Sequence, residues 1–209
     1  MDVSQSSDRA PARSRAATRE RILRSGTALF AARGLHDVTT HDIAADAGVA
    51  AGTFYLHFPD KQTLFREIVF DAVEDLKRDL LAARSAAPDH AAAVRAQADV
   101  LLDFAERRGD LVRILFGRNS EARGLGADVL DHLALGLRER LTQSQSEGAT
   151  HAAIDPGVAA QAIVGMWSRV LAWWIEDPGM VARERLIETL TTFELSGVLR
   201  TPAGQRPRS

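Results

Sequence analysis

The chain has 209 residues, of which 45% are hydrophobic and 26% are charged, and its formal net charge is −2. These proportions are typical of a globular protein of one or two domains and argue against general disorder. The chain contains no cysteine, which excludes disulfides, thiolate metal sites and cysteine nucleophiles. The N-terminus lacks the apolar core of a signal peptide. The most apolar stretch, 162–175, is interrupted by Arg169 and is too short to span a bilayer. We therefore expect a cytoplasmic protein with no membrane partner.

The positive charges are concentrated near the N-terminus, whereas the excess of acidic residues lies later in the chain. The net charge alone argues mildly against a nucleic-acid partner, because binding to phosphates needs a positive surface. The uneven distribution instead predicts a small basic module attached to a larger acidic body. The arginines of the first segment are Arg9, Arg13, Arg15, Arg19, Arg21 and Arg24.

Residues 1–15 are rich in Ser, Arg, Ala and Pro, which predicts a flexible basic arm. A helix is expected from Thr18 to Arg33, with its apolar residues on one face, Gly26 allowing a close approach and Gly34 ending it.

The segment that follows has the signals of two short helices joined by a tight turn. Thr39-Thr40-His41-Asp42 resembles a capping box and predicts a short helix over 41–47. Gly48 suits the left-handed conformation of a turn, and a second short helix is expected over 51–57 with Phe54 and Phe58 directed inward.

The rest of the chain is also helical by pattern. An apolar repeat of helical period predicts a long helix over 61–84. Further helices are expected over 89–108, 110–116, 127–145, 156–175 and 181–199, and no strand pattern is present. The predicted fold is all-α with about nine helices. We divide it into a three-helix head over 16–62 with its motif over 39–58, a helical body over 63–200 that shares the long helix, and a loose tail over 201–209.

Two short helices joined by a glycine-containing turn after a first helix are typical of a DNA-binding helix-turn-helix. The second helix of such a motif must face outward to enter a major groove, and small residues at its start let the backbone approach DNA. Ala50, Ala51 and Gly52 are small at this point. Thr53, Tyr55 and His57 offer hydrogen-bonding groups. Lys61 lies at the start of the next helix, where a phosphate would be favoured.

The run from Thr39 to Lys61, TTHDIAADAGVAAGTFYLHFPDK, resembles the DNA-binding signature of the tetracycline-repressor (TetR) family of bacterial regulators. The segment 21–34, RILRSGTALFAARG, resembles the helix that precedes this signature. The likeness covers about the first third of the chain, and the later helices match the family only in number, length and order. It implies that Thr40 caps the first short helix and touches phosphate. It also implies phosphate contacts by Thr53, Tyr55 and Lys61.

In the same likeness His57 lies at a phosphate or at the groove edge, and the residues that face or border the bases are Ala51, Gly52, Thr53 and Leu56. The chain departs from the family at Ala50, where Ser or Thr is frequent, and at Ala51, where a polar or basic residue is frequent. The alanine at the cap position loses about 1 kcal/mol of helix capping. Base recognition then depends on Thr53, on methyl contacts to thymine, on His41 and on the basic arm.

Apolar residues of the body could line a pocket for an apolar or amphipathic small molecule, or could simply form the core. The candidates for the pocket are Phe104, Leu111, Leu115, Phe116, Leu133, Leu137, Trp167, Leu171 and Trp174.

The helix over 156–175 is apolar nearly all round, which predicts burial on more than one face. In the resembled family the last two helices pair with their copies in a dimer. Arg169 lies within this apolar helix, and we considered Glu176, Glu194 or a ligand carboxylate as its partner. The candidates for the dimer seam are Ile163, Met166, Val170, Trp173, Leu186, Leu190 and Phe193, with Leu195 as a further one.

The sequence contains no constellation typical of an enzyme and implies no cofactor. Asp131-His132 and Asp89-His90 have no further ligand at helical spacing, so neither predicts a metal site. We expect a homodimeric regulator that binds a near-palindromic operator on double-stranded DNA. It would be a repressor that a small-molecule effector releases by population shift; activation is left open. The alternative is a helical small-molecule-binding or interaction protein whose head does not read DNA.

Overall fold

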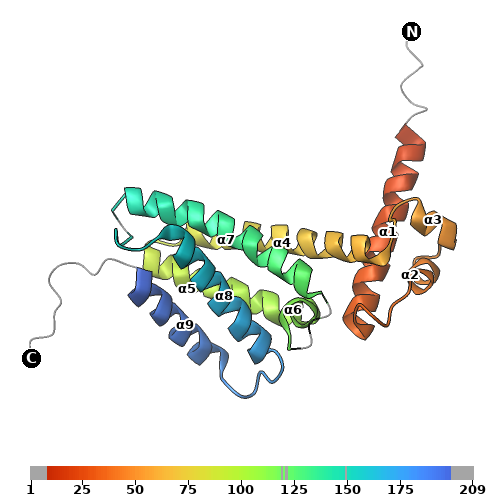
Figure 1. Ribbon diagram of the computed structural model, residues 1–209. Helices are drawn as coiled ribbons and strands as arrows, with labels where there is room; N and C mark the ends of the chain where they lie inside the picture. The colour runs from red at the N-terminus through yellow and green to blue at the C-terminus, as the bar shows by residue number, and fades with distance from the viewer. Residues whose placement is uncertain (1–8, 119, 121, 149, 199–209) are drawn as a thin grey trace, which may run out of the picture. The chain divides into compact units, whose positions relative to one another are not determined.

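The computed structural model describes residues 9–118, 120, 122–148 and 150–198. Within these residues the chain forms nine helices and no strand (Figure 1), so the predicted all-α fold is confirmed. The helices are α1 (Arg9–Arg33), α2 (Thr40–Asp46), α3 (Ala51–Tyr55), α4 (Lys61–Ala86), α5 (His90–Arg107), α6 (Gly109–Phe116), α7 (Arg123–Ser146), α8 (Pro156–Trp174) and α9 (Arg183–Val198).

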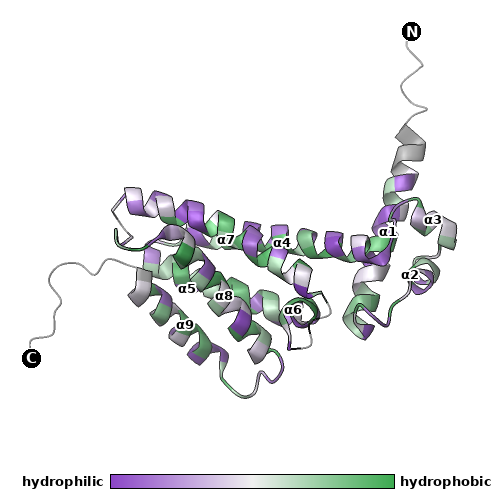
Figure 2. Cartoon of the chain, viewed as in Figure 1, coloured by the Kyte–Doolittle hydropathy of each residue, from purple (hydrophilic) through white to green (hydrophobic). Residues whose placement is uncertain are grey.

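The chain divides into two compact units, 1–72 and 73–209, and α4 contributes its first half to one unit and its second half to the other. From the sequence we predicted that the head ends at residue 62 and that the head and the body share the long helix. Green hydrophobic and purple hydrophilic residues alternate along α4 and α7 in Figure 2, as expected of helices that bury one face.

The first unit packs α1, α2 and α3 and the start of α4 around an aromatic and aliphatic core. Phe30 and Phe65 meet edge to face with ring centroids 5.2 Å apart. A Cβ added at Gly26 would lie 2.7 Å from Leu64 Cδ2, so glycine is what allows α1 to approach α4 this closely. Gly48 has a φ of 65°, the left-handed conformation expected of the turn between α2 and α3.

The prediction of a flexible basic arm over 1–15 is wrong from Arg9 onward, because α1 already begins at this residue. Ala10, Arg13 and Ala16 favour helix, and Pro11 is tolerated because amides of a first helical turn have no partner within the helix. Residues 1–8 of the arm and the tail over 201–209 lie outside the described residues.

The second unit is a bundle in which α8 packs against α6 and α7, and α9 packs against α5 and α8. Trp167 and Trp174 on α8 and Leu186 and Leu190 on α9 are all buried in its main core. The start of α9 is held to α5 by Arg183, which forms ion pairs with Asp99, Asp103 and Glu106. Among the described residues no helix is both long and apolar enough to cross a membrane.

Candidate nucleic-acid interface and ligand pocket

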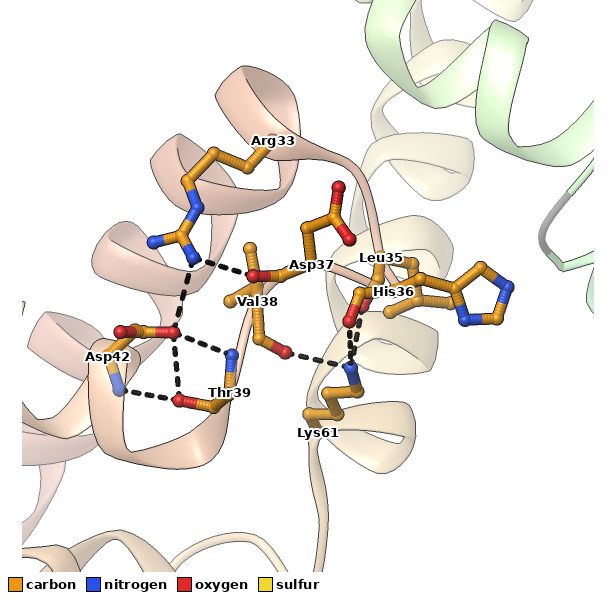
Figure 3. Close-up of polar contacts among 8 residues, drawn as sticks. All are labelled: Arg33, Leu35, His36, Asp37, Val38, Thr39, Asp42 and Lys61. Atoms are coloured by element: carbon orange, nitrogen blue, oxygen red, sulfur yellow. Dashed lines mark hydrogen bonds and ion pairs between the residues drawn. The ribbon is translucent and has the colours of Figure 1, made fainter.

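The entry to α2 is fixed by a reciprocal pair of side chains, Thr39 and Asp42 (Figure 3). Thr39 Oγ1 accepts a hydrogen bond from the Asp42 amide at 3.1 Å, and Asp42 Oδ2 accepts one from the Thr39 amide at 2.9 Å. The hydrogen bonds from Thr39 keep the pKa of the Asp42 carboxyl below its usual value. The expected capping box is therefore confirmed, but its capping residue is Thr39 and not Thr40.

Thr40, freed from capping, turns toward α3. Its Oγ1 lies 3.0 Å from the Tyr55 hydroxyl, within hydrogen-bonding distance. This contact places two of the three hydroxyl groups that we expected to meet phosphate side by side, one from each helix of the motif. Thr40 is half-buried and Tyr55 is 52% exposed, so the pair remains accessible from outside.

The short helix α3 separates its buried and exposed residues sharply. Phe54 and Phe58 are fully buried, as expected, whereas Leu56 is 71% exposed. Nothing lies within 4 Å of a Cβ added at Gly52. Ala51 and Thr53 are half-buried and His41 on α2 is exposed. Ala50 makes no side-chain cap for α3, which agrees with the predicted loss of a cap.

Lys61, which we expected to contact phosphate, has an internal role. Its Nζ donates to the carbonyl oxygens of Leu35 at 2.7 Å, His36 at 3.0 Å and Val38 at 2.7 Å (Figure 3). An ammonium group has three donors, and here all three are used. Lys61 thus ties the segment after α1 to the first turn of α4.

Two arginines of α1 lie near the C-terminal end of α3. Arg15 Nη2 donates to the Leu56 carbonyl oxygen at 3.5 Å, and the Arg19 guanidinium lies 5.0 Å from the centre of the Phe58 ring. Arg19 also forms an ion pair with Glu67. Burial, and then the charges of Arg15 and Arg19, lower the pKa of His57. Both basic groups belong to α1 beside the motif. This was expected for Arg19, whereas Arg15 was expected in the arm.

The second unit contains a cavity of about 130 Å³. This is close to the ~150 Å³ of an apolar cavity that holds a benzene ring. The cavity is bordered by side chains of α4, α5, α6, α7, α8 and α9. Six of the predicted pocket residues line it: Phe104, Phe116, Leu133, Leu137, Trp167 and Leu171.

The other three predicted pocket residues do not border this cavity. Leu111, Leu115 and Trp174 are buried within the protein. The Trp174 indole N–H donates to the Val181 carbonyl oxygen at 2.8 Å, which fixes that ring in the core. The periodicity of the sequence predicts that these residues are buried, but it does not distinguish a residue packed in the core from one that lines a cavity.

Two charged residues of the cavity wall were not among the predicted ones, Arg140 on α7 and Glu194 on α9. Glu194 Oε2 accepts a hydrogen bond from the Trp167 indole N–H at 3.1 Å, and burial raises the pKa of the Glu194 carboxyl. Arg140 continues the stripe of Leu130, Leu133 and Leu137 at helical spacing, and this is the signal that could have found it.

The predicted dimer seam needs correction at two positions. Leu186 and Leu190 are buried in the core of a single chain and are not available to a second copy. Met166, Val170 and Trp173 are half-buried at the edge of that core, Ile163 lines the cavity, and Phe193 is 67% exposed. Leu195 is half-buried.

The expected partners of Arg169 have other contacts. Arg169 is exposed, Glu176 pairs with Arg118 at 3.9 Å and Glu194 binds Trp167.

The described residues contain no group of three or more His, Cys, Asp or Glu side chains that could hold a metal ion. The two Asp-His pairs have structural contacts. Asp89 caps α5 by accepting from the Ala92 amide at 2.8 Å, and His132 Nε2 lies 2.9 Å from Glu74 Oε1.

Comparison with known proteins gives a consistent result for the head and for the whole chain. Residues 22–68 match the family model described as "Bacterial regulatory proteins, tetR family". The uncharacterized HTH-type transcriptional regulator YdgC of Bacillus subtilis is 30% identical over 175 residues, which cover 80% of this chain and 88% of YdgC.

Two further similar proteins cover most of the chain. The HTH-type transcriptional repressor KstR2 of Mycolicibacterium smegmatis is 25% identical over 88% of this chain and 91% of its own length. The solved SmeT–triclosan complex, of the Stenotrophomonas maltophilia efflux-pump repressor, matches with a TM-score of 0.68. It is 21% identical and covers 92% of this chain and 98% of SmeT.

Proposed function

This chain belongs to the tetR family of bacterial regulatory proteins, and we propose that it is a homodimeric repressor which a small molecule releases from its operator. The operator is a near-palindromic stretch of double-stranded DNA, and the protein acts in the cytoplasm. Two copies of α3 would enter successive major grooves, as helix-turn-helix dimers do.

The observation that carries the DNA-binding part is the outward face of the α2–α3 motif. Phe54 and Phe58 anchor α3 from beneath, while Gly52, Tyr55 and Leu56 face outward. We assign phosphate contacts to the Thr40 and Tyr55 hydroxyls and place His57 at the edge of the groove. The base-facing surface then comprises His41, Ala51, Gly52, Thr53 and Leu56.

Lys61 is left out of this surface because its three donors already bind carbonyl oxygens. In its place Arg15 and Arg19, beside the end of α3, supply the positive charge that attracts phosphates.

The cavity of the second unit supports the ligand-responsive part. Its wall is mostly apolar, and its size fits a small organic molecule. SmeT, which has the same fold, was solved in complex with the small molecule triclosan. A ligand that binds the cavity better in the conformation that does not fit DNA would release the operator.

For the homodimer we propose the outer surfaces of α8 and α9. Met166, Val170 and Trp173 leave apolar surface on α8, and Phe193 does so on α9. Exposed apolar surface of this kind is typical of an interface between chains.

The experiment that tests this function is a fluorescence-anisotropy titration of labelled DNA from upstream of the protein's own gene, with an unrelated duplex as control. We expect tighter binding to the first duplex and a steep loss of affinity as salt rises. Equal, weak binding to all fragments, including a genome-wide set, would overturn the proposal and favour a head that does not read DNA.

A matched pair of variants locates the surface. Thr53→Ala on α3 should lower the discrimination between the two duplexes by about 1–3 kcal/mol. Thr189→Ala on the exposed side of α9 makes the same chemical change away from the motif and should leave discrimination unchanged.

A further inference from the structure

We propose that the effector of the cavity is an organic monoanion, a carboxylate with a small apolar body, and that Arg140 binds its charged group. This inference rests on the proposed ligand-responsive function and names the class of ligand.

The first observation is that Arg140 borders the cavity without a partner of its own. Among the described residues no hydrogen bond or ion pair is formed by its guanidinium, although the side chain is half-buried. A guanidinium carries five N–H donors in a planar fork that matches a carboxylate. Because no partner within the described residues occupies this fork, it is available to a carboxylate bound in the cavity.

The second observation is the sign of the charges around Arg140. Burial lowers its pKa, and so does the positive charge of Arg84; Glu139 only partly offsets them. The local field thus disfavours a further positive charge and favours an anion at this part of the wall.

The third observation concerns the acid of the cavity wall. Glu194 forms no ion pair with Arg140 and is instead held by the Trp167 indole N–H. Burial raises the pKa of this carboxyl, and the hydrogen bond from Trp167 partly offsets that shift. Because Glu194 binds Trp167 and is not the counterion of Arg140, Arg140 remains available as the anchoring group for an anion.

The other residues of the cavity wall determine the polarity and size of the uncharged part of the ligand. Leu76, Leu80, Leu133 and Leu137 are among its apolar residues, and the space of about 130 Å³ suits a phenyl ring or a short alkyl chain. Among the described residues that line the cavity Arg140 is the only cation, and its planar fork matches the two oxygens of one carboxylate. We therefore assign a monocarboxylate to this site in preference to a phosphate ester.

The test uses calorimetric titration of the full-length protein at neutral pH with two probes of nearly the same shape, the anionic 3-phenylpropionate and the neutral 3-phenylpropanamide. We expect the carboxylate to bind about 10- to 100-fold more tightly than the amide, as a charge-assisted hydrogen-bonded pair allows. Equal affinity, tighter binding of the amide, or no binding of either probe would overturn the inference.

Variants assign the effect to one side chain. Arg140→Gln should abolish the preference for the carboxylate while the affinity for the amide stays the same. Arg138→Gln, on an exposed position of the same helix, should keep the preference. If Arg140→Gln fails to fold, Arg140→Lys keeps the charge but loses the planar fork, and the preference should fall between those of the other two proteins. A preference that persists in Arg140→Gln contradicts the assignment.

Failure of this inference and failure of the proposed function are distinguishable, since probe binding is measured without DNA. Binding of neutral probes with no preference for the anion, together with specific DNA binding, refutes only the anionic effector. Anion binding by Arg140 in a protein that reads no DNA refutes only the repressor.

Discussion

The two units of the chain use polar side chains for different purposes. In the first unit Thr39, Asp42 and Lys61 bind backbone groups and fix the segments around the DNA-facing motif. In the second unit Arg140 and Glu194 face a cavity, and Arg183 joins α9 to α5 at their surface through ion pairs with three acidic residues. A surface that must fit the fixed shape of a DNA groove needs a rigid backbone. A site that accepts a small molecule needs space instead.

The largest effect that separates the two units is expected from the same truncation in each. Leu64→Ala in the first unit removes a fully buried side chain and should lower the free energy of unfolding by about 3–5 kcal/mol. Leu137 borders the cavity, so part of the space around its side chain is already empty. Leu137→Ala should therefore lower the free energy of unfolding by less than about 2 kcal/mol. Urea unfolding followed by circular dichroism, at one protein concentration, measures both. Equal losses of unfolding free energy would contradict the distinction between the filled core of the first unit and the core of the second unit, which contains a cavity.

A smaller loss of stability is expected when Lys61, which ties the segment after α1 to the first turn of α4, is replaced. Lys61→Met leaves three carbonyl oxygens without their charged donor and should cost about 2–3 kcal/mol. Lys77→Met in the second unit breaks a partly exposed pair with Glu74 and a contact with His132 at 3.0 Å, and should cost less than about 1 kcal/mol. The same urea titrations compare them. If Lys61→Met is as stable as the wild type but binds DNA poorly, Lys61 is a phosphate contact after all.

Two helix caps provide a comparison of nearly equal size. Thr39→Ala at α2 and Asp89→Ala at α5 each remove one side-chain cap and should each cost about 1 kcal/mol of stability. Their effects on operator affinity should differ, because only α2 supports the DNA-facing surface. Anisotropy titrations of both variants check this, and an equal loss of affinity would show that the two units are not separate in function.

The smallest effect concerns pH and the cavity. Burial raises the folded pKa of Glu194 above its usual value, so its contribution to stability is complete below the unfolded pKa and is lost as pH rises through the folded pKa. Glu194→Gln keeps an acceptor for Trp167 but cannot ionise. Its melting temperature should therefore rise relative to wild type as pH increases from 4 to 8, by about 2 °C at most. Glu188→Gln, an exposed acid on α9, should show no such rise.

The head was predictable in detail because its signals are local. Thr39 and Asp42 lie three residues apart, and Gly48 marks a turn, so spacing alone identified them. The role of Lys61 was not predictable, since the carbonyl oxygens that it binds lie more than twenty residues earlier in the chain. The assignment of Thr40 as the capping residue came from the family resemblance, whereas the three-residue spacing to Asp42 points to Thr39, which is the cap in the structure.

The body was predictable only as a set of buried helices. The sequence placed Leu186 and Leu190 at a seam between chains because apolar periodicity does not say which partner covers a face. The cavity depends on how well side chains from six helices fill the space between them, and no local pattern encodes that. Arg140 was overlooked although its helical spacing from Leu133 and Leu137 places it on the same face, whereas Arg169 drew attention by its apolar neighbours and is exposed.

The positions of the aromatic residues provide an optical consequence. The chain has one tyrosine and three tryptophans; Tyr55 lies on α3, and all the tryptophans lie on α8. Tryptophan emission thus reports on the second unit alone, with Trp167 at the cavity wall, and the absorbance of the single phenol reports on the first. The unlabelled protein carries a separate spectroscopic probe for each half of its proposed function.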